Sequence, residues 1–529
     1  MSFSTVLFFA FLIVGLVGYY VLPKKLQWIW LLIISYAYYF SYSVKTSVFL
    51  VFTTLVTYAG ARLLDKLNTE GKEYIAANKQ TMSKEEKKVY KEKLKKKKRL
   101  VVWAMIVLAF GLLAVVKYGN FIITNIDALV LAIGHGQYFD PPSIILPLGI
   151  SFYTFQSFSY IVDVYHAKYA AEKNVFKYAL FVSFFPQLLQ GPIGRFDRLA
   201  HQLYEGHSFE LKRIEFGIQR VMWGLFKKMV LADRVAGVVS EIFTNYTSYG
   251  GWYNIVAVLL YSIQLYADFS GGIDIVIGTA QMFGITMDEN FRQPFFSRSI
   301  SEFWRRWHIT LGTWMKDYIF YPFSLSKCMN KFGKWCKKHI GSYAAKTLPV
   351  CLADILVFFV VGIWHGAEWK YIMYGLYNGF IMAFSSFAQP AYNWLHTKTH
   401  IDKDSKGWRL VQIIRTFILV NIGFYFDMAP GMVDALVMIK QSITGFSLSQ
   451  VGIAAFKPLG MESRDFVIVL AGCIIIFIVS IIKEKGISVR ESLAAKPVAI
   501  RWAVYYGLII FTLVFGATAA STGFLYANF

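Results

Sequence analysis

Long apolar runs separated by short polar breaks dominate this chain. Near the N-terminus, three such runs cover residues 2–22, 26–43 and 46–64, with breaks at 23–25 and around Lys45. Each approaches the roughly 20 residues that an α-helix needs to cross a bilayer. Runs of the same kind recur later, at residues 100–116, 371–387, 410–426, 466–482 and 502–520. The pattern predicts an all-α polytopic membrane protein.

The middle of the chain is apolar but interrupted. Segments 147–165, 176–193, 213–243 and 253–284 contain Gly, Pro, Gln, Asp and Arg among their apolar residues. Irregular, polar-spotted helices at membrane depth are tolerated only inside protein or beside a water-filled cavity. We therefore expect a bundle of about 11–14 transmembrane and re-entrant helices around a tunnel. A transporter would show the same interruptions.

Composition narrows the class of protein. The chain is 56% hydrophobic and only 16% charged, yet it carries a net charge of +22. Much of this charge lies in loops beside apolar runs, which is the positive-inside pattern and not a nucleic-acid footprint. The four cysteines form no CxxC pair, so neither a disulfide framework nor a metal site is predicted.

Charged segments orient the spans. Residues 66–99 are rich in lysine and also acidic, which is typical of a solvated cytoplasmic helix; contact with anionic lipid headgroups is an alternative. Placing this segment inside puts the N-terminus outside, two crossings earlier. The basic stretch 483–501 is also expected inside, so the last span leaves the C-terminal tail outside.

Two histidines have settings that suggest chemistry. His365 follows the uncharged apolar run 357–364, and an imidazole at membrane depth is by default a functional-site hypothesis. His308 ends the polar aromatic stretch that begins at Ser301. Helical spacing predicts that Ser301, Arg305 and His308 share one face. Each histidine alone is as well explained by a structural role.

Five stretches together carry a family resemblance. The text Asn290-Phe-Arg-Gln-Pro-Phe-Phe-Ser-Arg-Ser-Ile-Ser-Glu-Phe-Trp-Arg-Arg-Trp-His-Ile-Thr-Leu311, followed by Gly362-Ile-Trp-His-Gly-Ala367, resembles the membrane-bound O-acyltransferase (MBOAT) family. The similarity is to the bacterial branch with the alginate O-acetylation protein AlgI and the teichoic-acid D-alanylation protein DltB. The upstream stretches that match are 147–156, 185–193 and 267–275.

The resemblance implies roles for the two histidines. His365 matches the family's catalytic histidine and is expected to act as general base, because an imidazole pKa lies near the working pH. His308 matches the assisting position, where it would orient the substrate or polarise the carbonyl. A structural hydrogen-bonding role for His308 is nearly as well supported.

Four other residues are candidates for substrate binding. Trp304 and Arg305 would meet the acyl donor, although an interface anchor and a lipid-headgroup contact are the alternatives. Asp268 and Gln190 would line the donor path, although polar contacts between packed helices explain both equally well.

The last six residues, Phe524-Leu-Tyr-Ala-Asn-Phe529, read by themselves as an aromatic belt at the membrane interface. They also resemble the C-terminal F-x-Y-x-x-F motif of DltX, the small membrane companion in D-alanylation. The resemblance implies that Tyr526 carries the acyl group covalently. A phenol ionises more readily than an aliphatic alcohol, and a covalent relay splits one difficult transfer into two.

This reading divides the chain into four parts. Residues 1–117 are N-terminal transmembrane helices with the basic cytoplasmic loop 65–99, and 118–390 are the MBOAT catalytic core. Residues 391–520 are C-terminal transmembrane helices, and 521–529 form an extracytoplasmic acyl-carrier-like tail.

The expected function is O-acylation of a cell-surface polysaccharide from the bacterial cytoplasmic membrane. The donor is expected to be acetyl-CoA, with no bound cofactor and no metal, and membrane lipids surround the protein. As in related systems, an extracytoplasmic SGNH-type partner would complete the transfer. The alternatives are D-alanyl transfer from a carrier protein to a teichoic-acid-like polymer and, from another class, a polysaccharide or lipid transporter.

Overall fold

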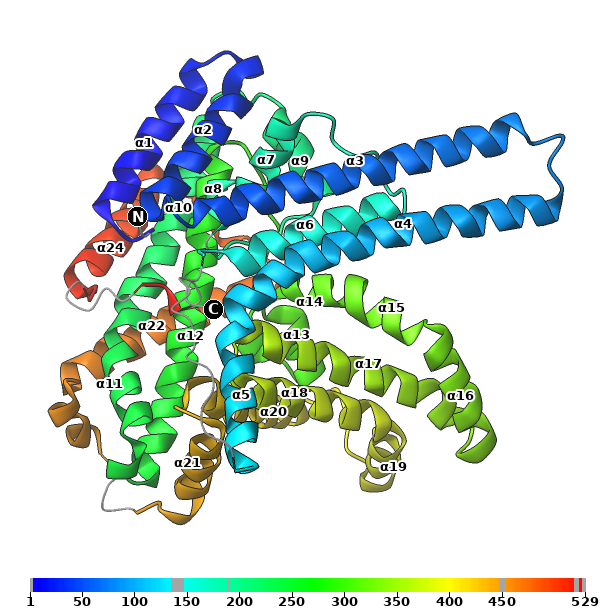
Figure 1. Cartoon of the computed structure of the whole chain (residues 1–529). Coiled ribbons are helices and arrows are strands. Elements are labelled where there is room, and N and C mark those ends of the chain that lie inside the picture. The colour runs from blue at the N-terminus through cyan, green and yellow to red at the C-terminus, as the bar shows by residue number, and fades with distance from the viewer. Residues whose placement is uncertain (1–2, 135–146, 189, 448–451, 518–522, 526–529) are drawn as a thin grey trace. The chain divides into compact units, whose positions relative to one another are not determined.

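The computed structural model describes residues 3–134, 147–188, 190–447, 452–517 and 523–525 (Figure 1). The described residues are helical or lie in loops, and their β-type pairing is a single isolated bridge between Phe291 and Trp307. Contacts within the chain divide it into two compact units. The first comprises residues 1–218 and 276–288, and the second comprises residues 219–275 and 289–529.

Among the described residues, seven helical stretches are long and apolar enough to cross a bilayer. They are Ser47–Ala77, Lys84–Ala132, Gly251–Met282, Ser342–His365, Lys406–Met428, Ser463–Glu484 and Val498–Phe515. A shorter apolar helix, Val6–Val21, precedes them. The prediction of an all-α polytopic membrane protein is confirmed.

The first unit contains the helices of the N-terminal part. They are α1 (Val6–Val21), α2 (Lys24–Tyr42), α3 (Ser47–Ala77), α4 (Lys84–Leu113), the π-helical η1 (Ala114–Tyr118), α5 (Gly119–Ala132), α6 (Ile150–Tyr165), α7 (Val175–Ser183), α8 (Phe185–Leu188) and α9 (Phe196–Tyr204). Both α10 (Leu211–Leu225) and α12 (Gly251–Met282) contribute residues to each unit.

The expected loop 65–99 is a helical hairpin. Helix α3 continues to Ala77, α4 begins at Lys84, and the two helices run side by side in Figure 1. The Ser83 hydroxyl accepts from the backbone N–H of Glu86, whose carboxylate accepts from the Ser83 N–H. This capping box starts α4 close after α3 ends, so the charged residues extend two spans instead of forming a loop.

The second unit holds the two histidines. After η2 (Phe226–Ala232, π-helical) its elements are α11 (Asp233–Thr244), α13 (Ile300–Arg306), α14 (Ile309–Met315), η5 (Lys316–Phe320, π-helical), α15 (Tyr321–Ser324), α16 (Lys327–His339), α17 (Ser342–His365), α18 (Trp369–Phe387), α19 (Gln389–Thr399), α20 (Lys406–Met428), α21 (Met432–Thr444), α22 (Ser463–Glu484), α23 (Val489–Ala494) and α24 (Val498–Phe515). The apolar pattern had not predicted α19 or α21.

Helices α17 and α18 form a hairpin with close backbone contact (Figure 1). A Cβ on Gly375 would lie 2.2 Å from the carbonyl oxygen of Phe358 and 2.9 Å from the Cα of Gly362. Gly375 and Gly379 are spaced as in the small-xxx-small pattern that lets membrane helices approach each other. This contact fixes the end of α17, where His365 lies.

The predicted apolar segment 213–243 contains a π-helical bulge. Helix α10 runs into η2, and η2 into α11, with two consecutive lysines, Lys227 and Lys228, buried in the bulge. Apolar side chains of η2 pack against α22 and α24 around Phe226, Val230 and Ile468. Bulges of this kind are frequent at functional sites.

Candidate functional site

His365 is the last residue of α17 and is buried, with 7% of its surface exposed. The next residue, Gly366, is extended, and a Cβ there would lie 2.4 Å from the Tyr371 ring. Close packing of α18 against this glycine thus accompanies the end of the helix. The His365 imidazole packs edge-to-face against Tyr374, with ring centroids 5.5 Å apart. Its surroundings are aromatic, as expected for an imidazole kept from bulk water.

His308 lies at a break between two helices, and the prediction of one continuous helix through Ser301, Arg305 and His308 is wrong. Helix α13 ends at Arg306, α14 begins at Ile309, and His308 has φ 47° and ψ 52°. This left-handed conformation is uncommon for a residue with a Cβ. Backbone hydrogen bonds hold it: the Ile309 N–H donates to Asn290 O at 3.0 Å, and the Arg292 N–H donates to Arg306 O at 2.9 Å.

Asn290 fixes the orientation of the His308 ring. Its Oδ1 accepts from the backbone N–H of Thr310 at 2.9 Å and from the Thr310 hydroxyl at 2.9 Å, and it lies 3.2 Å from His308 Nδ1. A backbone N–H can only donate, so the atom that it meets must be the amide oxygen and not the nitrogen. Nδ1 therefore carries the proton, and the neutral ring has its lone pair on Nε2.

The two histidines share one aromatic neighbour. The Trp364 ring centroid lies 5.7 Å from that of His308 and 5.3 Å from that of His365. On another side, the Phe269 ring of α12 meets the His308 ring at 4.9 Å. Burial, with a smaller contribution from His365, lowers the pKa of His308 well below its ordinary value. His308 is therefore neutral at pH 7.

Trp304, from the motif that contains His308, contacts the helices that carry the motif with His365. Its indole N–H donates to the Asn378 side-chain oxygen at 3.1 Å, and its ring contacts Phe358 at 5.1 Å. Asn378 in turn donates to the Tyr374 carbonyl at 2.9 Å. Trp304 thus joins α13 to the hairpin that carries His365, and its role toward a substrate stays a prediction.

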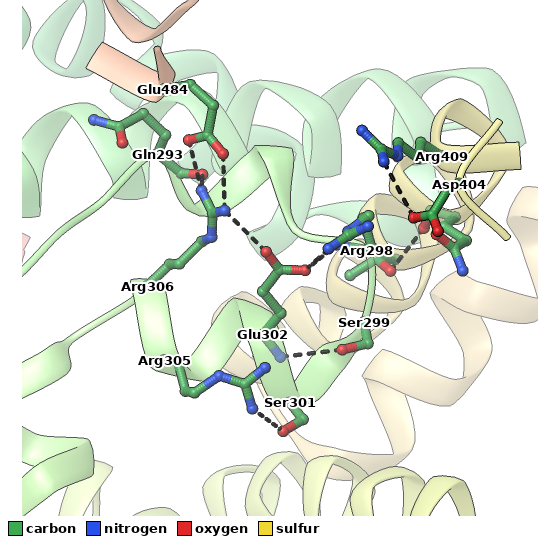
Figure 2. A network of polar contacts seen from close by, with 12 residues as sticks. Gln293, Arg298, Ser299, Ser301, Glu302, Arg305, Arg306, Asp404, Arg409 and Glu484 are labelled. Atoms are coloured by element: carbon green, nitrogen blue, oxygen red, sulfur yellow. Dashed lines mark hydrogen bonds and ion pairs between the residues drawn. The ribbon is translucent and has the colours of Figure 1, made fainter. Parts of the chain in front are cut away.

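Arg305 and Arg306 differ although they are adjacent (Figure 2). Arg306 forms a bidentate pair with Glu484, at 2.7 and 2.8 Å, and also meets Glu302 at 2.9 Å. Arg305 is exposed and donates to the Ser301 hydroxyl at 2.7 Å. Of the two, Arg305 is the one whose charge faces solvent, so a contact with donor phosphates stays a prediction for it.

The remaining candidates fall in different places. Gln190 is fully buried in the first unit, and Asp268 is buried in the second unit beside Lys228, 2.6 Å away. Asp268 is therefore part of a buried ion pair, which favours helix packing over an open lining of the donor path. Phe524 is buried as well. The other two tail positions, Tyr526 and Phe529, lie outside the described residues.

A polar cavity of about 40 Å³ lies within the second unit. Arg220, Lys227 and Lys483 line it, opposed by the carboxylates of Asp274 and Glu289. Arg220 and Lys227 both bind Asp274, at 2.9 and 2.6 Å. Three cations against two carboxylates leave the lining with a positive balance.

An aromatic layer separates this cavity from His308. Phe291 lines the cavity and meets Phe269 and Trp307 edge-to-face, with centroids 4.9 and 5.0 Å apart. Phe269 then contacts His308. Thus a charged compartment and the histidine pair lie on either side of one layer of rings.

The sequence had not singled out the side chain of Asn290 or that of Asp427. Asp427 lies near the end of the apolar helix α20, is buried, and accepts from the Tyr261 hydroxyl at 2.6 Å. A carboxylate in an apolar run is a signal that could have found it. Among the described residues, no three His, Cys, Asp or Glu side chains are grouped to hold a metal ion.

Comparisons with known proteins agree with this geometry. The model of the MBOAT, membrane-bound O-acyltransferase family, matches residues 171–422. The probable alginate O-acetylase AlgI of Azotobacter vinelandii is 34% identical over 310 residues, covering 58% of this chain and 56% of that protein. The match thus spans little more than half the length of this relative.

Two other relatives align over more of their own length. The peptidoglycan O-acetyltransferase of Helicobacter pylori is 29% identical over 503 residues, covering 88% of this chain and 84% of that protein. The teichoic acid D-alanyltransferase of Bacillus subtilis is 29% identical over 300 residues, covering 55% and 71%. The region that the family model matches includes both His308 and His365. Residues 171–422, just under half of the chain, thus match the membrane-bound O-acyltransferase family, and the relatives include AlgI and teichoic acid D-alanyltransferase proteins.

Proposed function

We propose that this protein is a membrane O-acyltransferase that supplies acetyl groups for O-acetylation of a cell-surface polysaccharide. The observation that carries the proposal is the pair of buried imidazoles, His308 and His365, that share Trp364. Relatives named as alginate O-acetylases and a peptidoglycan O-acetyltransferase support the acetyl group and the polymeric acceptor.

His365 acts as general base. An acceptor hydroxyl attacks the thioester carbonyl and gives its proton to the imidazole; the C–O bond forms, the C–S bond breaks, and the thiolate leaves. The proton then passes from the imidazolium to the thiolate or to water. A buried, aromatic setting keeps bulk water from competing for the acyl group.

His308 orients the acceptor. With Nδ1 held by Asn290 and the ring neutral, Nε2 is an acceptor. Such a ring receives a hydrogen bond from a hydroxyl, whereas polarising a carbonyl oxygen requires a donor. Of the two assisting roles expected for His308, this geometry supports orienting the substrate.

The donor is acetyl-CoA, which reaches the histidines from the cytoplasmic side. Its phosphates suit the cavity that Arg220, Lys227 and Lys483 line, and an acyl thioester suits the aromatic layer beyond it. The bacterial cytoplasmic membrane is the proposed location, with both termini outside. This sidedness follows from the basic segments of the sequence.

The acyl group leaves through the tail. We assign Tyr526 as the acceptor of the first transfer, which forms a phenyl ester, and an extracytoplasmic SGNH-type partner as the second acyltransferase. An aryl ester is still a reactive donor, because phenolate is a better leaving group than an alkoxide. The acyl group would thereby cross the membrane while coenzyme A stays on the cytoplasmic side.

D-alanyl transfer from a carrier protein is the second candidate. The relatives named teichoic acid D-alanyltransferase support it. Helix α16 carries five lysines in 13 residues and suits an acidic carrier. Comparing acetyl-CoA with a D-alanyl-charged carrier protein as donor distinguishes the two candidates.

Mass spectrometry of the C-terminal peptide tests the proposal. Purified protein is incubated with acetyl-CoA, as wild type and as the His365→Ala and Tyr526→Phe variants, with Tyr506→Phe as the matched control in exposed α24. We expect an acetyl adduct on Tyr526 in wild type and control only. Full modification of the surface polymer in cells carrying His365→Ala would instead favour a transporter.

A further inference from the structure

A buried charged cluster lies in the second unit, beside the histidines. The Lys228 ammonium in η2 meets Asp268 of α12 at 2.6 Å and Asp233 of α11 at 2.8 Å. All three side chains are almost fully buried. Burying ions is unfavourable unless each is paired and hydrogen-bonded. Two carboxylates around one ammonium leave a negative excess, which favours further hydrogen-bond donors at this point.

The C-terminal tail supplies such a donor. The backbone N–H of Leu525 donates to Asp268 Oδ2 at 3.0 Å, while Lys228 donates to the Gly523 carbonyl at 3.3 Å. Lys228 also lies 4.8 Å from the centroid of the Phe524 ring, a cation–π contact. One ion pair therefore binds the C=O of Gly523 and the N–H of Leu525 and contacts the ring of Phe524 between them.

The chain before the tail is tied to the same segment. The Ala517 N–H donates to the Met229 carbonyl at 3.0 Å, and Arg234 donates to the carbonyl of Phe515. Met229 and Arg234 flank the charged cluster in η2 and α11. Contacts at positions 515, 517, 523 and 525 thus follow one surface, so the tail's attachment is extended and not a single chance contact.

The residue that holds Leu525 is followed in α12 by the residue that contacts His308. Asp268 holds Leu525, and Phe269, the following residue of α12, contacts the His308 ring at 4.9 Å. Consecutive Cα atoms are about 3.8 Å apart. Leu525 is therefore bound one residue along α12 from the ring that covers His308, and the next residue in the chain is Tyr526.

We propose that Lys228, Asp268 and Asp233 form a clamp that holds the backbone of Gly523–Leu525 and so positions the tail for acyl transfer. This inference rests on the proposed function, in which Tyr526 is the carrier. The three residues are positioning residues: Lys228 and Asp268 bind the tail backbone, Asp233 pairs with Lys228, and none is proposed to touch the acyl group. Asp268 then serves the acceptor and not the donor path.

The clamp is specific for backbone and for one ring. It binds the N–H of Leu525 and the C=O of Gly523, which are backbone groups that any tail sequence has. Lys228 also contacts the ring of Phe524, which depends on the side chain at that position. We therefore expect Phe524→Leu to weaken tail acylation and Phe524→Tyr to preserve it, because tyrosine also presents a ring face to a cation.

The test uses the full-length protein and a variant that keeps the charge balance. Lys228→Gln/Asp268→Asn removes one positive and one negative charge together. The control is Asp434→Asn, which removes one negative charge at the acceptor of the Tyr246 hydroxyl. Three quantities are measured: hydrogen exchange of the C-terminal peptide, acetylation of Tyr526 from acetyl-CoA, and acetyl transfer to the small phenol N-acetyl-tyrosinamide.

We expect the double variant to speed exchange of the tail peptide and to slow Tyr526 acetylation, each by about tenfold or more, since hydrogen bonds to charged groups are lost. Transfer to the small phenol should remain within about twofold, because this acceptor does not need the clamp. The control should match wild type in all three measurements.

Each negative result contradicts a different part of the proposal. Unchanged exchange of the tail peptide in the double variant would overturn the clamp, whatever the acetylation result. Faster exchange with wild-type acetylation of Tyr526 would overturn its positioning role. If wild type shows no Tyr526 adduct but still transfers acetyl to the small phenol in a His365-dependent way, the proposed tyrosyl ester is wrong. The hydrogen-exchange data would then decide whether the clamp only anchors the tail.

Discussion

Replacing Asn290 by Asp tests the assignment of His308 as a neutral acceptor. The new side chain keeps the size of Asn290 and an oxygen that can accept from Thr310 and from His308 Nδ1, 3.2 Å away in wild type. It adds a negative charge at that distance. The imidazolium form of His308 would then be stabilised, whereas in wild type burial and His365 lower its pKa.

The size of the effect follows from the distance. An opposite charge within about 4–6 Å raises a histidine pKa by about 1–3 units. The sign is positive, because the aspartate favours the charged ring. If neutral His308 is the active form, activity is lost as pH falls through its pKa, so the acid limb of the pH profile should move up by about 1–2 units.

The assay is the pH dependence of kcat/KM for acetyl transfer from acetyl-CoA to a small phenol, followed by release of the free thiol. We expect Asn290→Asp to lose activity at a higher pH than wild type as the pH falls, and to regain it once the pH rises above the shifted limb. Asn421→Asp, at a buried amide of α20 that bonds Ser262, is the matched control and should leave the limb in place. An unchanged profile for Asn290→Asp would refute the assigned protonation state.

The Asn290→Ala variant separates the effect of the added charge from the effect of losing the hydrogen bonds that Asn290 accepts from His308 and Thr310. Asn290→Ala removes the acceptor of three hydrogen-bond contacts to buried groups of His308 and Thr310. Leaving buried donors unsatisfied costs about 1–3 kcal/mol each. We expect a lower Tm and low activity at every pH, with no upward move of the acid limb. An upward move of the limb in the alanine variant would contradict the argument.

Three further changes have direct expectations. Gly375→Leu puts atoms within 2.2 Å of the Phe358 carbonyl, so we expect overpacking to cost about 1–3 kcal/mol and lower the Tm; an unchanged Tm would contradict the close contact. Lys483→Gln should raise KM for acetyl-CoA about tenfold with kcat nearly unchanged, if the cavity binds phosphate; dephospho-CoA derivatives would measure which phosphate is involved. Glu484→Gln, which weakens the pair with Arg306, should lower thermal stability by at most about 1 kcal/mol with little change in the pH profile, as a melting curve would record.

His365, the candidate catalytic histidine, was accessible from sequence because its signal is local. An uncharged run followed by His365 and a glycine places an imidazole at the end of an apolar helix, whatever the rest of the chain does. Helices lie where the apolar runs predicted them, with ends shifted by a few residues, but those at 26–43 and 371–387 are not among the seven stretches that can cross a bilayer. Periodicity failed at His308, because hydrogen bonds to Asn290 outweigh the propensity for one continuous helix.

The sequence by itself determined the class of protein, the membrane spans and the two histidine motifs, since apolar runs and short motifs act over neighbouring residues. Only the tertiary structure decided which protonation state Asn290 imposes on His308, and that Asp268 binds the backbone of the tail at Leu525. Asp268 and Leu525 are 257 positions apart. A contact over that separation depends on how α12, η2 and α24 pack. Packing buries the ion pair, and a buried carboxylate is stabilised by hydrogen-bond donors such as the Leu525 N–H. No local sequence pattern predicts which donor comes near it.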